Sequence, residues 1–140
     1  MSFKLYTGPS QMEYYPKKAS TAFNIGDLVL LDANGQIDKA TSTTDDHIGV
    51  IMEKVTSDMP TFATNARVQV LVPEQKTQFR VPVGTGSAAA TNVGEYLNLT
   101  DEKSVDVTSG ANRAVTCTKV LSATEVVVKI NSTAVNKPSV

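Results

Sequence analysis

The sequence has few of the residues that carry most enzymatic and metal chemistry. It contains one cysteine, one histidine and no tryptophan in 140 residues. A single thiol excludes an internal disulfide and a site of several thiolates within one chain. Basic and acidic side chains are nearly balanced, 13 against 14. The chain thus lacks the basic excess of typical nucleic-acid-binding proteins, and we expect neither nucleic acid nor membrane among its partners.

The sequence also lacks long hydrophobic runs. None approaches the ~20 apolar residues that a membrane-spanning helix needs. The first residues do not form the apolar core of a signal peptide. From these features we expect the chain to be made and folded in a cytosol. Its 140 residues are enough for one domain with its own core.

His47 and Cys117 are the side chains on which a catalytic or metal site would most depend. His47 follows Asp45 and Asp46, but no further ligands stand at zinc-site spacing and no nucleophile accompanies it. Cys117 lies in an alternating stretch, which predicts a small core residue rather than a nucleophile. The Gly84–Ser87 stretch lacks the Lys-Ser/Thr ending of a phosphate loop. The sequence therefore predicts no enzyme, no catalytic residues, no cofactor and no metal.

The stretch from residue 24 to residue 38 recurs in weaker form at residues 92–106. Each copy begins with turn residues and continues into a short apolar run typical of a strand. In the first copy, Asn34-Gly35 predicts a tight hairpin turn. Aligned without a gap, the copies pair Asn24/Asn92, Ile25/Val93, Gly26/Gly94, Asp27/Glu95, Val29/Leu97, Leu31/Leu99, Ile37/Val105 and Asp38/Asp106. We interpret the repeat as one β unit used twice.

Other short alternating runs, bounded by turn residues, fill the rest of the chain. They predict an all-β fold, a small barrel or sandwich of about eight or nine short strands with an internal quasi-repeat and an extended N-terminal arm. Gly49 within a strand indicates a bulge or a close backbone approach, and Pro82 indicates an edge or a bulge. We expect an N-terminal arm at residues 1–21, a β-barrel domain at 22–131 and a C-terminal tail at 132–140.

The N-terminal arm holds three of the four tyrosines. Disordered arms are usually poor in aromatic residues, so we expect this one to pack on something. Two placements remain open. The arm either lies as an extended strand on its own barrel, or docks on another subunit through aromatic anchors of the kind that interfaces favour.

Five short motifs follow one another between residues 23 and 130. They are Gly26-Asp27-Leu28-Val29, Ile48-Gly49-Val50, Val68-Gln69-Val70, Val81-Pro82 and Gly94-Glu95-Tyr96. Their order resembles that of the small β-barrel decoration, or cement, proteins of tailed-bacteriophage heads. The second copy departs from the pattern, because Ala114-Val115-Thr116 stands where Ile-Gly-Val is expected. The N-terminal arm is not part of the pattern either.

The resemblance implies a non-enzymatic virion structural protein that binds the outer surface of a bacteriophage head and stabilises the capsid. It implies the major capsid protein as partner, a homo-oligomer in the form of a trimer, and a place on the outer capsid surface after synthesis in the host cytoplasm. The candidate capsid or subunit contacts are Phe3, Leu5, Tyr6, Tyr14 and Tyr15, with strand pairing at an open sheet edge. Deletion of residues 1–21 is then expected to leave the barrel folded and to abolish attachment.

The residues alone leave other binding modules open. A β-barrel that binds a receptor, a glycan or an oligonucleotide would have the same general architecture. An oligonucleotide site needs interleaved aromatic and basic residues, of which Arg67, Phe79 and Arg80 are a thin supply. The absence of tryptophan removes the commonest platform for stacking a sugar.

Overall fold

Eleven β-strands make up nearly all the regular structure in the computed structural model, which describes residues 2–131. The strands are β1 (Lys4–Thr7), β2 (Ser10–Pro16), β3 (Leu28–Leu31), β4 (Ile37–Lys39), β5 (Gly49–Ile51), β6 (Arg67–Pro73), β7 (Gln78–Thr85), β8 (Tyr96–Asp101), β9 (Ser104–Asp106), β10 (Val115–Ser122) and β11 (Glu125–Ile130). One 3-10 turn, η1 (Ala90–Asn92), precedes β8. The all-β prediction is confirmed. Nine strands follow residue 22, and β1 and β2 add two more; the predicted tail at 132–140 lies outside the described residues.

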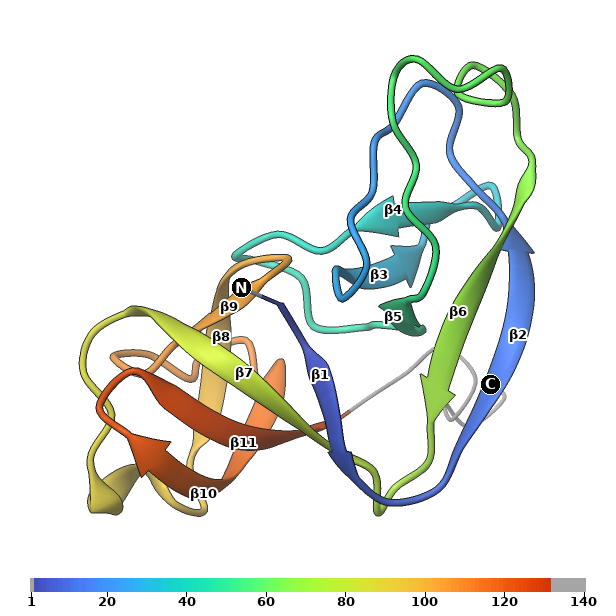
Figure 1. Ribbon diagram of the computed structural model, residues 1–140. Coiled ribbons are helices and arrows are strands. Elements are labelled where there is room, and N and C mark those ends of the chain that lie inside the picture. Colours follow the sequence, from blue (N-terminus) through green and yellow to red (C-terminus); the bar gives the residue numbers. More distant parts are fainter. Residues whose placement is uncertain (1, 132–140) are drawn as a thin grey trace.

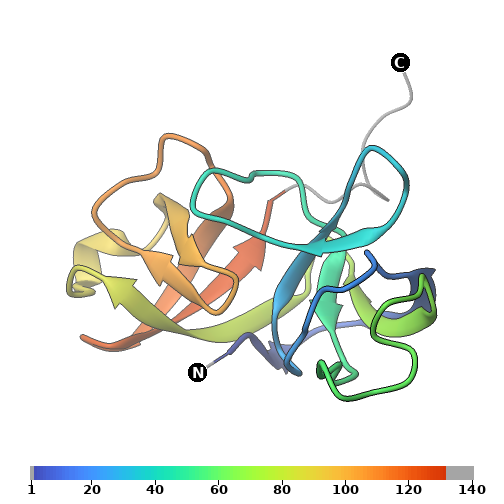
Figure 2. The same ribbon diagram turned by 90° about the horizontal axis from the view of Figure 1, so that it is seen from above.

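The strands form two five-stranded units that lie side by side (Figures 1 and 2). In the first, the order is β2-β6-β5-β3-β4, and a parallel bridge between Lys17 and Ile37 brings β4 back to the end of β2. In the second, the order is β7-β11-β10-β8-β9, and parallel pairing of Val83 with Val105 closes β9 onto β7. Strand pairing closes the second unit, whereas among the described residues the ends of the first meet only through that isolated bridge; we call them the first barrel (residues 10–73) and the second barrel (residues 78–130).

The two barrels have the same topology, with β2 to β6 matching β7 to β11. The register agrees at the repeat found in the sequence. Leu31 pairs with Ile37 in the first barrel, and their counterparts Leu99 and Val105 pair in the second. The prediction of one β unit used twice is therefore confirmed, and the duplication extends beyond that unit to the whole barrel.

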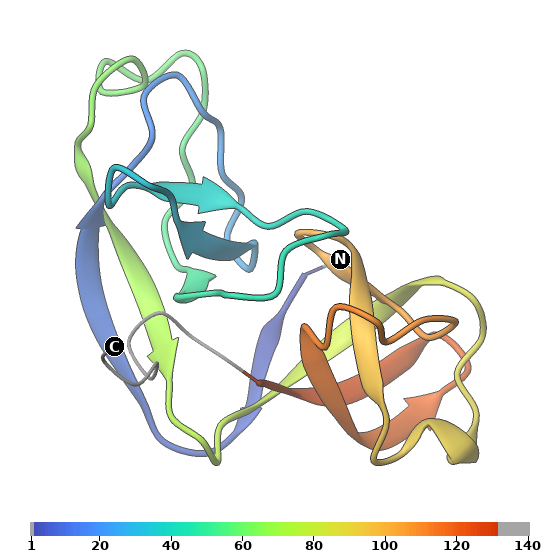
Figure 3. The same ribbon diagram turned by 180° about the vertical axis from the view of Figure 1, so that it is seen from behind.

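The segment predicted as an arm belongs to both barrels. β1 pairs with β7 of the second barrel, whereas β2 is the first strand of the first barrel and pairs with β6 along its whole length (Figure 3). Of the two placements that the sequence leaves open, the structure therefore shows the first: the segment lies on the sheets of its own chain. Lys17, near the end of this segment, is buried. Its Nζ donates to the carbonyls of Phe62 and Thr64, each at 2.6 Å. We now expect a chain without residues 1–21 to lose the first barrel.

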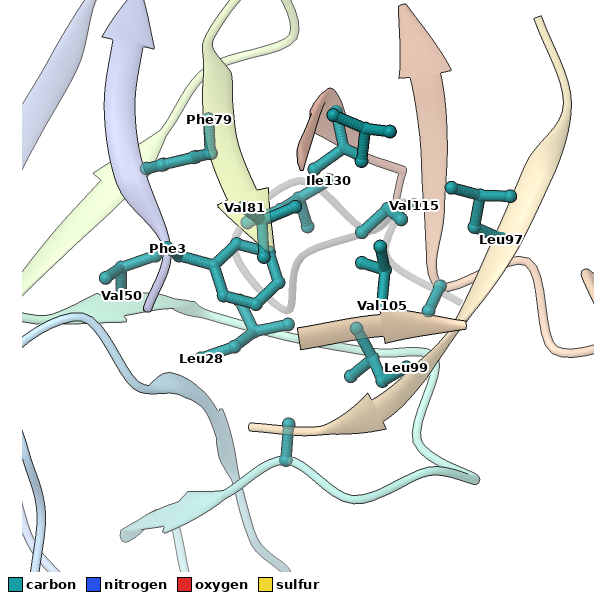
Figure 4. Close-up of a cluster of buried hydrophobic side chains, with 14 of the residues drawn as sticks. Phe3, Leu28, Val50, Phe79, Val81, Leu97, Leu99, Val105, Val115 and Ile130 are labelled. Carbon is teal, nitrogen blue, oxygen red and sulfur yellow. The ribbon is translucent and has the colours of Figure 1, made fainter. Parts of the chain in front are cut away.

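Two clusters of buried apolar side chains form the core. One fills the first barrel, and the other fills the second barrel and extends into the junction between the two. Phe3 lies in this junction among Leu28 and Val50 of the first barrel and Val81 of the second (Figure 4). Its ring meets that of Phe79 edge-on, with centroids 6.4 Å apart. The barrels are therefore held together by continuous apolar packing.

A charged contact also joins the barrels. Asp27 is fully buried, and its Oδ1 lies 3.0 Å from Nζ of Lys103 while its Oδ2 accepts the N–H of Asn24 at 2.9 Å. Nζ of Lys103 lies 2.9 Å from Oε1 of Glu102 as well. The carbonyl of Glu102 accepts the N–H of Leu28 at 2.8 Å. The turn between β8 and β9 is thus fixed on the start of β3.

Gly49 confirms the predicted close backbone approach. A Cβ at this position of β5 would lie 2.1 Å from the carbonyl oxygen of Leu71 on β6, which no small adjustment relieves. We expect Gly49→Ala to lower the free energy of unfolding by at least about 2 kcal/mol, measured by urea unfolding. Gly35→Ala is the control, because nothing lies within 4 Å there. Its φ of +73° limits the expected loss to about 1 kcal/mol. Equal losses at the two sites would contradict this account.

Candidate binding surface

Four large apolar side chains on β1 and β2 face solvent. The exposed fractions are 46% for Leu5, 42% for Tyr6, 48% for Met12 and 55% for Tyr14. All four stand on strands whose backbones are fixed by pairing with β7 or β6. Because the backbone is already fixed, covering these side chains costs no further backbone entropy, and tyrosine and methionine are enriched at protein interfaces.

The structure separates the five predicted contact residues. Leu5, Tyr6 and Tyr14 are exposed, but Phe3 is 2% exposed and belongs to the chain's own core, so the prediction of Phe3 as a contact is wrong. Tyr15 is half-buried against the core of the first barrel, and burial together with the nearby Glu13 carboxylate raises the pKa of its hydroxyl.

Met12 is a surface residue that the sequence reasoning missed. It stands two residues before Tyr14, so both side chains point to the same face of β2. This period of two was the signal that could have identified it. An apolar cleft of about 350 Å³ lies near Leu5, and its other lining residues include Ile25, Met52 and Leu71. Met12 is the direct cross-strand neighbour of Leu71, which connects the cleft to the exposed face of β2.

Among residues 2–131, no strand pairs with the outer edge of β2 at Met12 and Tyr14, where the carbonyl of Tyr14 accepts one long hydrogen bond, of 3.4 Å, from Nη1 of Arg67. The N–H of Lys17 donates to Ala66 on the β6 side, and the N–H of Lys18 donates to Ile37 on the opposite side. Because successive residues of a strand direct their backbone groups to alternate edges, the N–H and C=O of Met12 and Tyr14 point away from β6.

The second barrel shows what can cover such an edge. β7 occupies the position that β2 has in the first barrel, and its outer edge is paired with β1 through Lys4 and Arg80 and through Thr7 and Gln78. When the strand pairings of the two barrels are aligned through their matching strands, Tyr14 of the first barrel takes the position that Arg80 has in the second. The same edge is therefore covered by an antiparallel strand in one barrel and open in the other.

His47 is a buried neutral side chain. It has no exposed surface, and burial lowers its pKa to about 4, although the Asp46 and Asp45 carboxylates act in the opposite direction. Nε2 lies 2.8 Å from Oγ1 of Thr44, whose own hydrogen is donated to the carbonyl of Thr41. Nε2 therefore carries the proton, and Nδ1 has no partner among the described residues. This environment anchors the loop before β5.

Cys117 lies in the core of the second barrel, as the alternation in the sequence predicts. Burial raises the pKa of its thiol, and its Sγ donates to the carbonyl of Lys119 at 3.6 Å. Among residues 2–131, no three His, Cys, Asp or Glu side chains gather as metal ligands. No helix in that range is long and apolar enough to cross a membrane.

The most developed surface feature is therefore the one formed by β1 and β2. We call it the β1–β2 surface and define it by Leu5, Met12, Tyr14 and the open edge of β2. No protein-family model matches the chain, and no curated protein matches its sequence.

Proposed function

We propose that the chain is a non-enzymatic virion structural protein that binds the outer surface of a bacteriophage head and stabilises the capsid. The proposal rests first on the resemblance in motif order to capsid decoration proteins. The duplicated barrel adds support, because Gly26-Asp27 and Gly94-Glu95 open equivalent strands of the two barrels. Two barrels fixed to each other by a shared core form a stiff body of the kind a cement protein requires.

The observation that carries the proposal is the β1–β2 surface. It offers exposed apolar side chains next to backbone groups that can accept a further strand. Strand addition supplies affinity through main-chain hydrogen bonds and specificity through alternate side chains. We propose that the major capsid protein covers this surface, and that the chain acts as a trimer, whose symmetry would match a three-fold position on the head.

Tyr14→Pro is expected to abolish binding to purified undecorated phage heads while leaving the fold intact. The proline removes an N–H that points to the open edge and takes no part in the pairing of β2 with β6. We expect a loss of at least about tenfold in affinity, because the strand can no longer pair there and the tyrosine ring is lost. Co-sedimentation with heads measures the affinity, and thermal unfolding checks the fold.

Tyr14→Ala separates the two contributions. It removes the ring but keeps the backbone N–H, so we expect it to bind more weakly than the unaltered chain and more tightly than Tyr14→Pro. A proline variant that binds heads as tightly as the alanine variant would show that the open edge of β2 takes no part in attachment.

A further inference from the structure

A row of positive charge crosses the outer face of the second barrel. Lys4 on β1 pairs directly with Arg80 on β7, Arg80 pairs with Val127 on β11, and Val127 pairs with Lys119 on β10. Val126 and Val128, the neighbours of Val127, both point into the core. Successive side chains alternate between the faces of a sheet, so the row lies on the outside of the barrel, although Val127 itself has no exposed surface.

Two further side chains belong to this face. Lys129 stands two positions after Val127 and therefore points the same way. Tyr6 lies against Lys119, with Nζ 5.4 Å from the ring centroid and 3.4 Å from the hydroxyl oxygen. We call the set Lys4, Tyr6, Arg80, Lys119 and Lys129 the basic face. Lys4, Arg80 and Lys119 are exposed, and Lys129 is half-buried.

The basic face has little internal compensation. Glu125 pairs with Arg80, with Oε2 3.3 Å from Nε. Lys4, Lys119 and Lys129 form no ion pair with the residues that the structure describes. Like charges directly opposite each other on neighbouring strands, as Lys4 and Arg80 are, destabilise a sheet. The free protein therefore holds an arrangement that an acidic partner would relieve.

The fold itself does not require these charges. In the first barrel, the register places Tyr14 at the position of Arg80 and Gln69 at the position of Val127. The N–H of Met52, the residue that follows β5, donates to the carbonyl of Gln69. The same architecture is thus built there with neutral residues, so the cations of the second barrel serve something other than folding.

We propose that the basic face binds an acidic protein surface through aspartate and glutamate side chains of the partner. The inference rests on the proposed function, in which that partner surface is the outside of the phage head. A protein surface fits better than nucleic acid because the face offers a single aromatic ring, whereas single-stranded nucleic acid is held by several stacking rings.

The test is a pair of charge-reversal variants with equal net charge. Lys4→Glu with Lys119→Glu changes the basic face, and Lys54→Glu with Lys76→Glu changes exposed lysines elsewhere. For purified undecorated heads at an ionic strength near 0.15 M, we expect the first variant to bind at least about tenfold more weakly, and the control to stay within about twofold of the unaltered chain. Raising the salt concentration should weaken the binding of the unaltered chain to heads and hardly affect the binding of the first variant. Equal binding by the two variants would overturn the inference.

A second measurement does not depend on heads. The unaltered chain should bind poly-L-glutamate, the Lys4 and Lys119 variant should not, and an oligothymidylate of matched charge should bind more weakly than the polypeptide. Tighter binding of the oligonucleotide, or glutamate binding that is unchanged in the variant, would overturn the inference. If poly-L-glutamate binds through the basic face but no form of the chain binds heads, the proposed function fails and the assignment of an acidic protein partner stands.

Discussion

Replacing Lys103 with alanine is expected to lower the free energy of unfolding by about 3 kcal/mol, because it leaves the buried carboxylate of Asp27 without its cation. Asp27 has no exposed surface, and its remaining partner is the N–H of Asn24. The side chain of Lys103 is 30% exposed, so its removal opens some access to water and keeps the loss toward the lower end of the range for broken buried pairs. Urea unfolding at neutral pH measures the change.

A double-mutant cycle identifies the cause. In an Asp27→Asn background no buried charge is left without a partner, so Lys103→Ala should then lower the free energy of unfolding by about 1 kcal/mol or less. The pair should also weaken in alkali. Burial disfavours the charged amine of Lys103, but hydrogen bonds to Glu102 and Asp27 outweigh it and raise the pKa above its usual value. The stabilisation is therefore present at lower pH and is lost as the pH rises through this raised pKa. Equal losses in both backgrounds would show that Lys103 acts by packing alone.

Acidification is expected to destabilise the protein through His47. Its pKa is about 4 in the folded chain, against about 6.5 for an exposed imidazole. Between these values the unfolded chain binds a proton that the folded chain does not, so stability falls as the pH falls. Over the interval from pH 7.5 to pH 4.5 this single group should remove about 2.5 kcal/mol.

His47→Gln separates this effect from the titration of the carboxylates. Glutamine can still bond to Thr44 but takes up no proton. The variant is expected to be less stable than the unaltered chain at pH 7.5, and to lose about 2.5 kcal/mol less on going to pH 4.5. Guanidinium unfolding at both pH values gives the four free energies. Parallel losses in the two proteins would mean that His47 is not the group that couples acid to unfolding.

Features encoded by local pattern were predictable from the sequence. The repeat predicted equivalent strand pairs, because apolar residues recur at matched positions in both copies. Gly49 predicted a close approach, because only glycine leaves room beside the Leu71 carbonyl. Pro82 predicted an edge or a bulge. It lies on β7 between Arg80, which pairs with β1, and Val83, which pairs with β9, so its missing N–H faces a gap in the pairing.

Features that depend on distant parts of the chain were not predictable. Lys17 stands in a polar stretch, Pro16-Lys17-Lys18, yet the loop carbonyls of Phe62 and Thr64 make its burial possible. The hairpin predicted at Asn34-Gly35 joins β3 to β4, but its turn does not have the two positive-φ residues that were expected. Gly35 has positive φ but Asn34 does not, and β3 and β4 are joined through a longer loop held by the carboxylate of Asp32.

The candidate surface was partly predictable for the same reason. The sequence identified the aromatic residues of the first two strands, because their composition is unusual for an arm. It could not tell Phe3 from Tyr6, since the burial of Phe3 depends on the first barrel packing against the second. The sequence predicted strand pairing at an open sheet edge but not that β2 supplies it, because this becomes apparent only when β2 is compared with β7 and its covering strand β1.

The most direct test of the central claim is quantitative co-sedimentation of the full chain with purified undecorated phage heads, combined with its mass in solution by light scattering. The account predicts a trimer in solution and saturable binding at micromolar protein that Tyr14→Pro abolishes. A chain that stays in the supernatant at every concentration would contradict the proposed capsid function.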